Sequence, residues 1–355
     1  NRSHTPIVRA ARAQYSKCIV HCQGCWGAAA AAMDEALVSS LRAGRMHADT
    51  NGAINSLDFH RTEDLLVTAG DDESIRLYST TSGLLQKTLH SKKYGVSNLV
   101  FTHDANSVLY SSKNQWDESL RYLSLHDNRY LRYFKGHRGR VVSVSLSPKS
   151  DLFLSASMDR TVRLWDLRSH ACQGLLRATS APCAAFDEQG LIFAASSGES
   201  MVQLFDVRAY EKGPFKALPL PTDAGPVTVT QIKFSLSGED LLVTSERRIH
   251  VMDAFDGRIK HIFSPVPPAA HVGLGTPLEA SFSPDSQFVL SGGGDGAVRV
   301  WSCKTGAEVA AFKGHKGVPV ACKWAPRRML LATGCSAGGL GLWIPTLLPQ
   351  NAPRV

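Results

Sequence analysis

The sequence contains no apolar run that approaches the ~18–20 residues of a membrane-spanning helix. It also lacks the phosphate-binding P-loop, the zinc-protease motif H-E-x-x-H and the glycine pattern of dinucleotide-binding folds. These absences argue against a protein with membrane-spanning helices and against enzymes of those classes. Hydrophobic residues make up 43% and charged residues 20% of the 355-residue chain, which is ordinary for a globular protein.

Cysteine is scarce in the larger part of the chain and follows no recognisable spacing. The residues after position 50 include Cys172, Cys183, Cys303, Cys322 and Cys335. Their separations suggest neither a disulfide framework nor a set of metal ligands, which suits a reducing compartment where cysteine packs as a small apolar residue.

Acidic residues are absent from residues 1–32, which end in a run of alanines before Met33. This basic segment is interpreted as a disordered extension, as residues upstream of a true start at Met33, or as an organelle transit peptide. Its cysteines Cys18, Cys22 and Cys25 have the C-x3-C-x2-C spacing of the cluster motif of radical SAM enzymes. In those enzymes three cysteine thiolates hold an iron–sulfur cluster within an α/β barrel. No barrel is predicted, so we expect no cofactor.

Residues 142–178 read as four short strands. Apolar and polar residues alternate with the period of two that is typical of half-buried strands, and turn residues separate the runs. One four-stranded sheet of about 40 residues cannot bury both of its faces alone. Such a unit therefore requires stacked copies of itself.

Copies of this unit occur along the chain. One residue in each predicted third strand, usually aromatic, recurs at intervals of 40 to 49 residues, the period of WD-repeat propellers. These anchor residues are Tyr78, Leu123, Trp165, Phe205, Met252, Trp301 and Trp343. An acidic residue stands six positions before each anchor except the last, where Ala337 replaces it. The sequence predicts an all-β fold, a seven-bladed WD40 β-propeller spanning residues 50–347.

One repeat contains His137, Ser155, Asp159 and Trp165, which raises the question of a hydrolase triad. The same set recurs in degenerate form at blade spacing, which is not expected of a catalytic site. An imidazole can donate to the aspartate, and the serine hydroxyl can link the ring to the indole N–H. All of these groups would then be satisfied inside a stack of sheets. We interpret these residues as a structural tetrad.

The ring needs a fourth strand for its last blade. Only twelve residues follow the last anchor, and three of them are proline, so no strand is expected there. We expect residues 37–46, within a segment spanning 33–49, to pair with the last blade and remove its exposed edge. Residues 348–355 are expected to form a tail. The proline-rich segments 213–226 and 264–277 are expected to be surface loops.

Several stretches are specific beyond the general repeat pattern. They are SKKYGVSNLVFTHDANSVLYSSKNQWDESLRYLSLHDNRYLRYFKGH (91–137), TVRLWDLRSHACQGLL (161–176), GLIFAASSGESMVQLFDVRAYEKGPF (190–215), VMDAFDGRIKHIF (251–263) and LEASFSPDSQFVLSGGGDGAVRVW (278–301). Over residues 33–347 the chain resembles the WD-repeat protein 82 family. Members of this family are propeller subunits of COMPASS, the SET-domain complex that methylates histone H3 at lysine 4.

The resemblance implies a non-catalytic scaffold in the nucleus. Family members bind the SET-domain methyltransferase subunit and link it to RNA polymerase II with a phosphorylated tail. Relatives also belong to nuclear phosphatase and mRNA 3′-end processing complexes, and both remain alternatives here.

Two classes of predicted loop provide a physical counterpart to a phosphorylated partner. Loops between blades and loops between second and third strands share one rim of a propeller. Among the residues that they carry here are Lys92, Lys93, Tyr94, Lys113, Arg138, Arg140, Arg160, Arg247, Arg248 and Lys316. Such a rim could pair phosphates or carboxylates, although each residue could equally be a solvated loop residue. Beyond residue 32 the chain contains 35 basic and 31 acidic residues. This excess of positive charge is too small to predict sequence-specific nucleic-acid binding.

A second class of function rests on two consecutive repeats that end in W/F-D-x-R. The arginines are Arg168 and Arg208. Tandem boxes of this kind resemble those of substrate receptors for cullin-4 ubiquitin ligases, in which the arginine contacts the adaptor. Both residues could also be ordinary turn arginines that face solvent.

Overall fold

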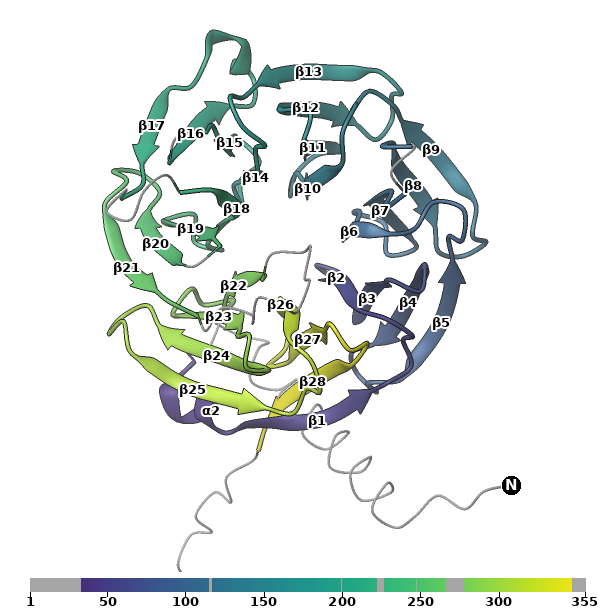
Figure 1. The fold of residues 1–355 in the computed structure, drawn as a ribbon, viewed down its shortest axis with the longest axis vertical. Coiled ribbons are helices and arrows are strands. Elements are labelled where there is room, and N and C mark those ends of the chain that lie inside the picture. Colours follow the sequence, from purple (N-terminus) through teal and green to yellow (C-terminus); the bar gives the residue numbers. More distant parts are fainter. Residues whose placement is uncertain are drawn as a thin grey trace, which may run out of the picture.

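Short strands with one apolar face account for almost all of the regular structure. The computed structural model describes residues 33–114, 117–198, 200–221, 227–246, 248–265 and 278–346. Their strands form seven separate four-stranded antiparallel sheets arranged as the blades of a ring (Figure 1). The prediction of an all-β, seven-bladed propeller is confirmed. No helix among these residues is long and apolar enough to cross a membrane.

Each of the first six blades uses four strands that follow one another in sequence. Blades one to three are β2 (Ile54–Phe59), β3 (Leu65–Gly70), β4 (Ser74–Ser79), β5 (Leu85–His90), β6 (Ser97–Phe101), β7 (Ser107–Ser111), β8 (Leu120–Ser124), β9 (Tyr130–Phe134), β10 (Val141–Leu146), β11 (Leu152–Ser157), β12 (Thr161–Asp166) and β13 (Cys172–Arg177). Blades four to six are β14 (Ala184–Phe186), β15 (Ile192–Ser196), β16 (Met201–Asp206), β17 (Lys216–Pro219), β18 (Val229–Phe234), β19 (Asp240–Ser245), β20 (Ile249–Asp253), β21 (Ile259–Phe263), β22 (Ala280–Phe282), β23 (Phe288–Gly292), β24 (Ala297–Ser302) and β25 (Glu308–Lys313).

The seventh blade combines strands from both ends of the chain. It consists of β26 (Pro319–Trp324), β27 (Leu331–Cys335), β28 (Leu340–Pro345) and β1 (Leu41–His47). β1 runs antiparallel to β28, so the predicted closing strand is confirmed.

The closing strand begins later than residue 37, where the sequence predicted it. A short helix, α2 (Glu35–Ser39), precedes it because Asp34 caps the helix and accepts a hydrogen bond from the Leu37 backbone N–H at 2.6 Å. The chain then turns through Ser40 into the strand.

The anchor residues occupy the third strands as predicted, and they are buried between neighbouring blades. Tyr78, Trp165 and Trp343 belong to the largest fully or nearly fully buried side chains. In six blades the pairing of the third and fourth strands shifts register beside the anchor, as at Leu164/Trp165. Such a bulge twists the outer strand locally.

Side chains of the innermost strands join each blade to the next around the ring. Between blades one and two, Asp58 Oδ2 accepts the Phe101 N–H at 2.8 Å, and between blades three and four Ser145 Oγ accepts the Phe186 N–H at 3.1 Å. The remaining junctions use the contacts Asn98 Nδ2–Val141 O (2.9 Å), Cys183 Sγ–Thr230 O (2.9 Å), Lys233 Nζ–Glu279 Oε1 (2.6 Å), Cys322 N–Glu279 Oε2 (3.2 Å) and Lys323 Nζ–Asp58 Oδ1 (2.9 Å). The last contact closes the ring between blades seven and one.

One proline-rich segment contains more structure than the sequence predicted. The expected loop 213–226 includes β17, which pairs with β16 and buries Leu218. Proline is tolerated at the end of this strand because the strand lies at the outer edge of its blade. Residues 222–226 and most of the segment 264–277 lie outside the described residues, as do residues 1–32 and the tail expected at 348–355.

The pairing of β1 with β28 leads to a test by truncation. Deleting residues 33–48 should leave β28 as an unpaired edge and cause aggregation, whereas deleting residues 1–32 should not. Light scattering of the two purified truncations measures the difference. Equal solubility would contradict a closing role for β1.

Candidate binding surfaces

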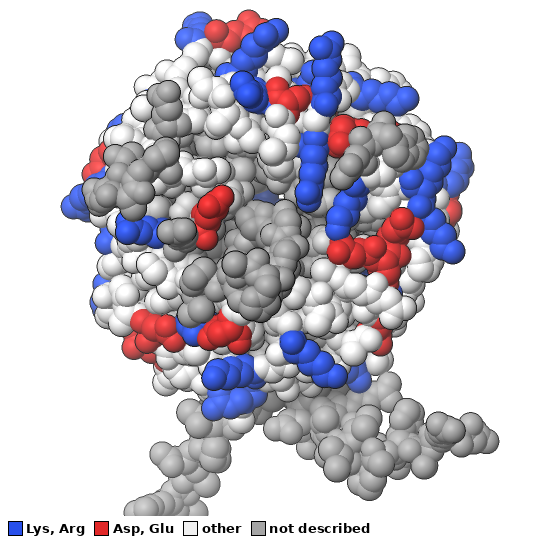
Figure 2. All heavy atoms as spheres, viewed as in Figure 1, with Lys and Arg blue, Asp and Glu red and all other residues white. Residues whose placement is uncertain are grey.

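All seven blades reverse their chain direction on the same two faces of the ring. We call the face with the loops between blades and between second and third strands the upper face. The lower face carries the turns between first and second strands and between third and fourth strands. Figure 2 looks onto the upper face, where Lys and Arg side chains gather over the second and third blades.

The structure separates the predicted binding residues into two groups. The upper face holds Lys92, Lys93, Tyr94, Lys113, Arg138, Arg140 and Arg160, together with Arg248 and Lys316. The lower face holds Arg168 and Arg208 in the turns after β12 and β16. Arg247 lies outside the described residues.

The upper-face residues of the second and third blades form two local clusters. In blade two, the Asn114 side chain donates to the Lys93 carbonyl at 3.1 Å, which joins the loop of residues 92–94 to the loop after β7. In blade three, the Met158 N–H donates to the Arg140 carbonyl at 2.9 Å. The two kinds of loop are thus held side by side, and the cations that they carry lie on one rim.

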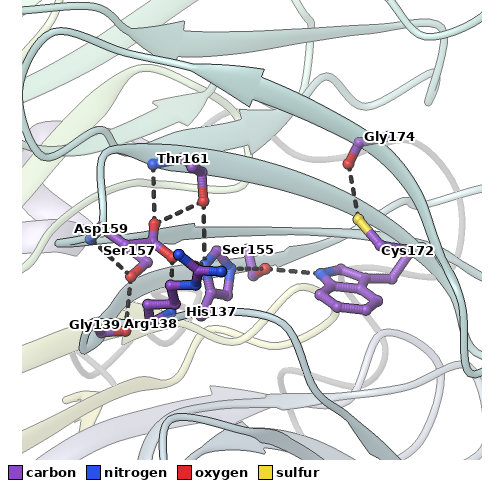
Figure 3. Close-up of polar contacts among 10 residues, drawn as sticks. His137, Arg138, Gly139, Ser155, Ser157, Asp159, Thr161, Cys172 and Gly174 are labelled. Carbon is purple, nitrogen blue, oxygen red and sulfur yellow. Dashed lines mark hydrogen bonds and ion pairs between the residues drawn. The ribbon is translucent and has the colours of Figure 1, made fainter.

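His137, Ser155, Asp159 and Trp165 form one chain of hydrogen bonds beneath this rim (Figure 3). The Trp165 indole N–H donates to Ser155 Oγ at 2.8 Å, and Ser155 Oγ lies 2.7 Å from His137 Nε2. His137 Nδ1 lies 2.9 Å from Asp159 Oδ2. Since the serine accepts the indole proton, it donates its own to Nε2. The neutral imidazole then carries its proton on Nδ1 and donates it to the aspartate.

The ionisation of the chain agrees with this arrangement. Burial lowers the pKa of His137, against the opposing effect of Asp159, so the ring is neutral. Burial alone would raise the pKa of Asp159, but hydrogen bonds from Thr161, the Arg138 N–H and His137 hold it at about 2. The sequence did not single out Thr161, whose hydroxyl donates to Asp159 at 2.6 Å.

The geometry is unsuited to nucleophilic catalysis. Ser155 is completely buried, and its oxygen already accepts from Trp165. A nucleophile must be reached by its substrate, and this hydroxyl faces only the interior of the blade stack.

A second serine pattern was missed in the sequence. Gly334-Cys335-Ser336-Ala337-Gly338 matches the hydrolase motif G-x-S-x-G, which requires a turn from a strand into a helix. Here it runs from the end of β27 into the turn before β28. The Ser336 hydroxyl accepts the Val318 N–H at 3.0 Å, so its role is to fix the turn.

Three other blades give the turn aspartate a different partner. Asp72 pairs with Arg76, Asp117 with Arg121 and Asp295 with Arg299, each four residues later in the chain. The spacing D-x-x-x-R is visible in the sequence, but only the histidine version was predicted from it. The corresponding acid of blade four, Glu199, lies outside the described residues.

Blade seven has an incomplete tetrad. His315 Nε2 lies 2.6 Å from Thr333 Oγ1, which also accepts the Trp343 indole N–H at 2.7 Å. Ala337 stands where the other blades have an acid, and the buried His315 Nδ1 has no partner among the described residues. Burial lowers the pKa of His315 to about 4. This blade therefore buries a polar atom that blade three satisfies.

The rim cations differ in how far they are neutralised by the protein itself. Lys113 forms an ion pair with Asp71 of blade one. Within the described residues, no acidic group lies within ion-pair distance of the exposed side chains Lys92, Lys93, Arg138, Arg140 and Arg160. These five predicted residues of blades two and three are therefore not neutralised by an ion pair within the described residues.

Tyr94 acts as a packing residue as well as a rim residue. The guanidinium of the fully buried Arg121 lies 3.5 Å from the centre of its ring, and the Lys93 ammonium lies 5.2 Å from the centre. Stacking of this kind stabilises a desolvated arginine. Substituting Tyr94 would disturb the blade itself, so this residue cannot report binding cleanly.

The two lower-face arginines are not equivalent. Arg168 forms ion pairs with Asp166 at 3.0 Å and Asp151 at 3.5 Å. Arg208 is exposed, and its side chain has no acidic partner in the part of the chain that the structure describes. Arg208, unlike Arg168, can therefore bind another protein without first breaking an ion pair to a described residue.

Neither a metal centre nor a disulfide is formed by the residues that the structure places. No group of three His, Cys, Asp or Glu side chains there could hold an ion. Cys172, Cys183, Cys303, Cys322 and Cys335 are free thiols, and burial raises the pKa of Cys183 to about 12. Cys18, Cys22 and Cys25 lie outside the described residues.

Known proteins resemble the chain over nearly its whole length. Residues 39–79, 128–166 and 277–302 match the family described as WD domain, G-beta repeat. Anthesis promoting factor 1 of Arabidopsis thaliana is 44% identical over 90% of this chain and 96% of its own. WD repeat-containing protein 82 of Drosophila melanogaster is 40% identical over 88% and 96%, respectively. Set1 complex component swd2 of Schizosaccharomyces pombe is 39% identical over 72% and 73%.

The hydrogen-bond chain of blade three yields a stability prediction. Replacing His137 with Ala removes the acceptor of the buried Ser155 hydroxyl proton and one of the donors to Asp159, and it should lower the free energy of unfolding by about 1–3 kcal/mol. Denaturant unfolding compares the variant with wild type. An unchanged midpoint would argue against a structural role for the tetrad.

Blade seven yields the reciprocal prediction. Replacing Ala337 with Asp supplies the missing acceptor for His315 Nδ1 and should stabilise the protein by about 1 kcal/mol, measured by thermal unfolding. In a His315→Ala background the same substitution should give no gain. A gain that persists in that background would have another origin.

Acid sensitivity provides a second readout of the same substitution. Because the folded-state pKa of His315 lies below its unfolded value of about 6.5, the unfolded state binds more protons between these values. Wild type should therefore lose stability as the pH falls from about 6.5 towards 4. The introduced carboxylate would pair with the protonated ring, so the Ala337→Asp variant should lose less.

Proposed function

Because the chain belongs to the WD-repeat protein 82 family, we propose that it is a non-catalytic scaffold subunit of a nuclear histone H3 lysine-4 methyltransferase complex of the COMPASS type. The observation that carries the proposal is the similarity to these relatives over about nine-tenths of the chain. The fission-yeast relative is named as a component of the Set1 complex. A rigid ring with two separate faces suits a subunit that holds other proteins together.

We further propose that the upper rim links this complex to transcribing RNA polymerase II through its phosphorylated tail. Five exposed cations without an acidic partner among the described residues are concentrated on blades two and three, and a phosphate forms strong charge-assisted hydrogen bonds with such groups. The SET-domain methyltransferase subunit would bind elsewhere on the ring. Both partners could then be held at once.

Other assignments are weaker on structural grounds. A cullin-4 substrate receptor would offer both W/F-D-x-R arginines to the adaptor, but Arg168 is already paired with two aspartates. Membership of a nuclear phosphatase or mRNA 3′-end processing complex is compatible with the same scaffold. Affinity purification of the tagged chain from its own cells separates these functions. Recovery of a SET-domain protein supports the proposal, and recovery of the cullin-4 adaptor without it would replace the proposal.

The rim hypothesis predicts a loss of binding after charge reversal. The peptides to be tested are heptad repeats of the RNA polymerase II tail. Changing Lys92, Lys93, Arg138 and Arg140 to Glu should abolish the preference for the phosphorylated over the unphosphorylated peptide in a fluorescence anisotropy titration. Wild-type affinity should fall as salt rises, because exposed charges are screened over about 8–10 Å near physiological ionic strength. Stability should change by no more than about a few tenths of a kcal/mol per site.

A matched control separates location from net charge. Lys149, Lys212, Arg258 and Lys304 are exposed on the lower face, and reversing them changes the net charge by the same amount. This variant should bind the phosphopeptide almost as wild type does. Equal losses in the two variants would mean that only the total charge matters, and the rim assignment would fail.

A further inference from the structure

The loop between blades three and four carries two exposed hydroxyl groups on the upper face. It spans residues 178–183, between β13 and β14. Thr179 and Ser180 are exposed, whereas Pro182 is buried and anchors the loop. Within the part of the chain that the structure describes, neither hydroxyl forms a hydrogen bond. Both are therefore open to an enzyme that modifies hydroxyl groups.

The strand before this loop carries a pattern that many protein kinases select. Exposed and less exposed side chains alternate along β13, and the exposed ones include Leu175 and Arg177. They precede Ser180 by five and three residues. Kinases that select basic substrates pair an arginine at the second of these positions with acidic side chains of their own cleft. Because β13 is the outer strand of its blade, one edge of its backbone is open to a second protein.

The fold makes only one of several matching serines accessible. Five serines among the described residues follow an arginine by three positions, and they are Ser79, Ser124, Ser143, Ser180 and Ser302. Four of them belong to the strands β4, β8, β10 and β24, whose backbones are paired with neighbouring strands. A kinase could reach those four only after a sheet had opened. The structure therefore selects Ser180.

A phosphate on Ser180 would stand beside a rim cation. The Ala178 N–H donates to the Arg160 carbonyl at 2.9 Å, so the loop runs alongside the turn that carries Arg160. The backbone of Arg160 is left-handed, with a φ of 64°. Blades six and seven have Gly296 and Gly338 in the same conformation at this position. Replacing Arg160 with Gly therefore removes the guanidinium without straining the turn.

The described acidic groups of this part of the upper face have other partners. Asp159 is bonded to His137 within the tetrad, and Glu118 of blade two interacts electrostatically with Arg140. The exposed side chain of Arg160 forms no ion pair within the described residues. Arg160 is thus the cation that a new phosphate on the neighbouring loop can pair.

We propose that Ser180 is a phosphorylation site for a kinase that selects arginine three residues before its target, and that the phosphate pairs with Arg160. In the transfer, the Ser180 oxygen bonds to the γ-phosphorus of ATP, the bond from that phosphorus to the leaving ADP breaks, and the hydroxyl proton passes to the kinase. The new group carries a charge of about −1.5 to −2 near pH 7. Resting on the proposed function of the upper rim, the same phosphate would repel a phosphorylated partner and switch the rim off.

The site is tested by treating the full-length chain with activated calmodulin-dependent protein kinase II and MgATP. Mass spectrometry of fragments should locate a phosphate on Ser180. Arg177→Gln should be phosphorylated there about tenfold more slowly, because one charge-assisted contact with the kinase is lost. Arg208→Gln removes an exposed arginine of the lower face as a matched control and should react as wild type does. No phosphate on Ser180, or an equal rate in Arg177→Gln, would overturn the proposal.

Phosphorus-31 NMR tests the ion pair. A neighbouring guanidinium favours the doubly charged phosphate and should lower its second pKa below the usual value of about 6. Arg160→Gly should return this pKa to the usual value, whereas Arg208→Gln should leave it lowered. The same pKa in wild type and in Arg160→Gly would show that the phosphate does not pair with Arg160.

Phosphopeptide binding separates this inference from the proposed function. In anisotropy titrations, the chain phosphorylated on Ser180 should bind the heptad phosphopeptide about tenfold more weakly than the untreated chain. Kinase-treated Ser180→Ala should bind it as the untreated chain does. Equal affinity before and after phosphorylation of wild type would overturn the regulatory role. If the untreated chain bound no phosphopeptide, the rim function would fail, and the mass and NMR measurements would still decide whether Ser180 is a modification site.

Discussion

Burial of both faces of a small sheet is the constraint on which the whole molecule depends. A four-stranded blade gains a buried interior only between two neighbours, so all seven blades bury both faces only when the ring is closed. The innermost strands show how each junction is fixed. Side chains of one blade bond to the backbone or side chains of the next, and the Lys323–Asp58 ion pair joins the last blade to the first. Register and closure are thus determined by polar contacts inside an apolar stack.

The turn aspartate shows how one physical problem is solved in different ways. The turn carboxylate needs donors, and a neutral histidine meets this need in blade three while an arginine four residues later meets it in blades one, two and six. In both arrangements the cations and acids nearest to the interior are bonded to one another. The charges that remain free on the upper face are those of loop residues that the fold does not use, which is why they are available to a partner.

The fold was predictable because its pattern is repeated along the chain. Seven third-strand anchors at regular spacing define the blades, and the prolines after Trp343 indicate that the closing strand comes from the other end of the chain. The start of that strand was not predictable from alternation alone, because Asp34 caps a helix whose residues also fit a strand pattern. The sequence also could not predict which rim residues form ion pairs. The sequence does not distinguish Lys113 from Lys93, since the pairing of Lys113 with Asp71 depends on two loops from different blades.

The pairing of β1 with β28 also fixes the order of events when the chain is made. Leu41 is synthesised before the strands of blades one to six, whereas its partner Pro345 is synthesised after them. Until then the other blades can form in turn, while β1 has no sheet to join and blade seven does not exist. Contacts between such distant parts of a chain form slowly. The nascent protein is therefore an open arc with two unpaired ends, and β1, made before every blade, is the last strand to find its place.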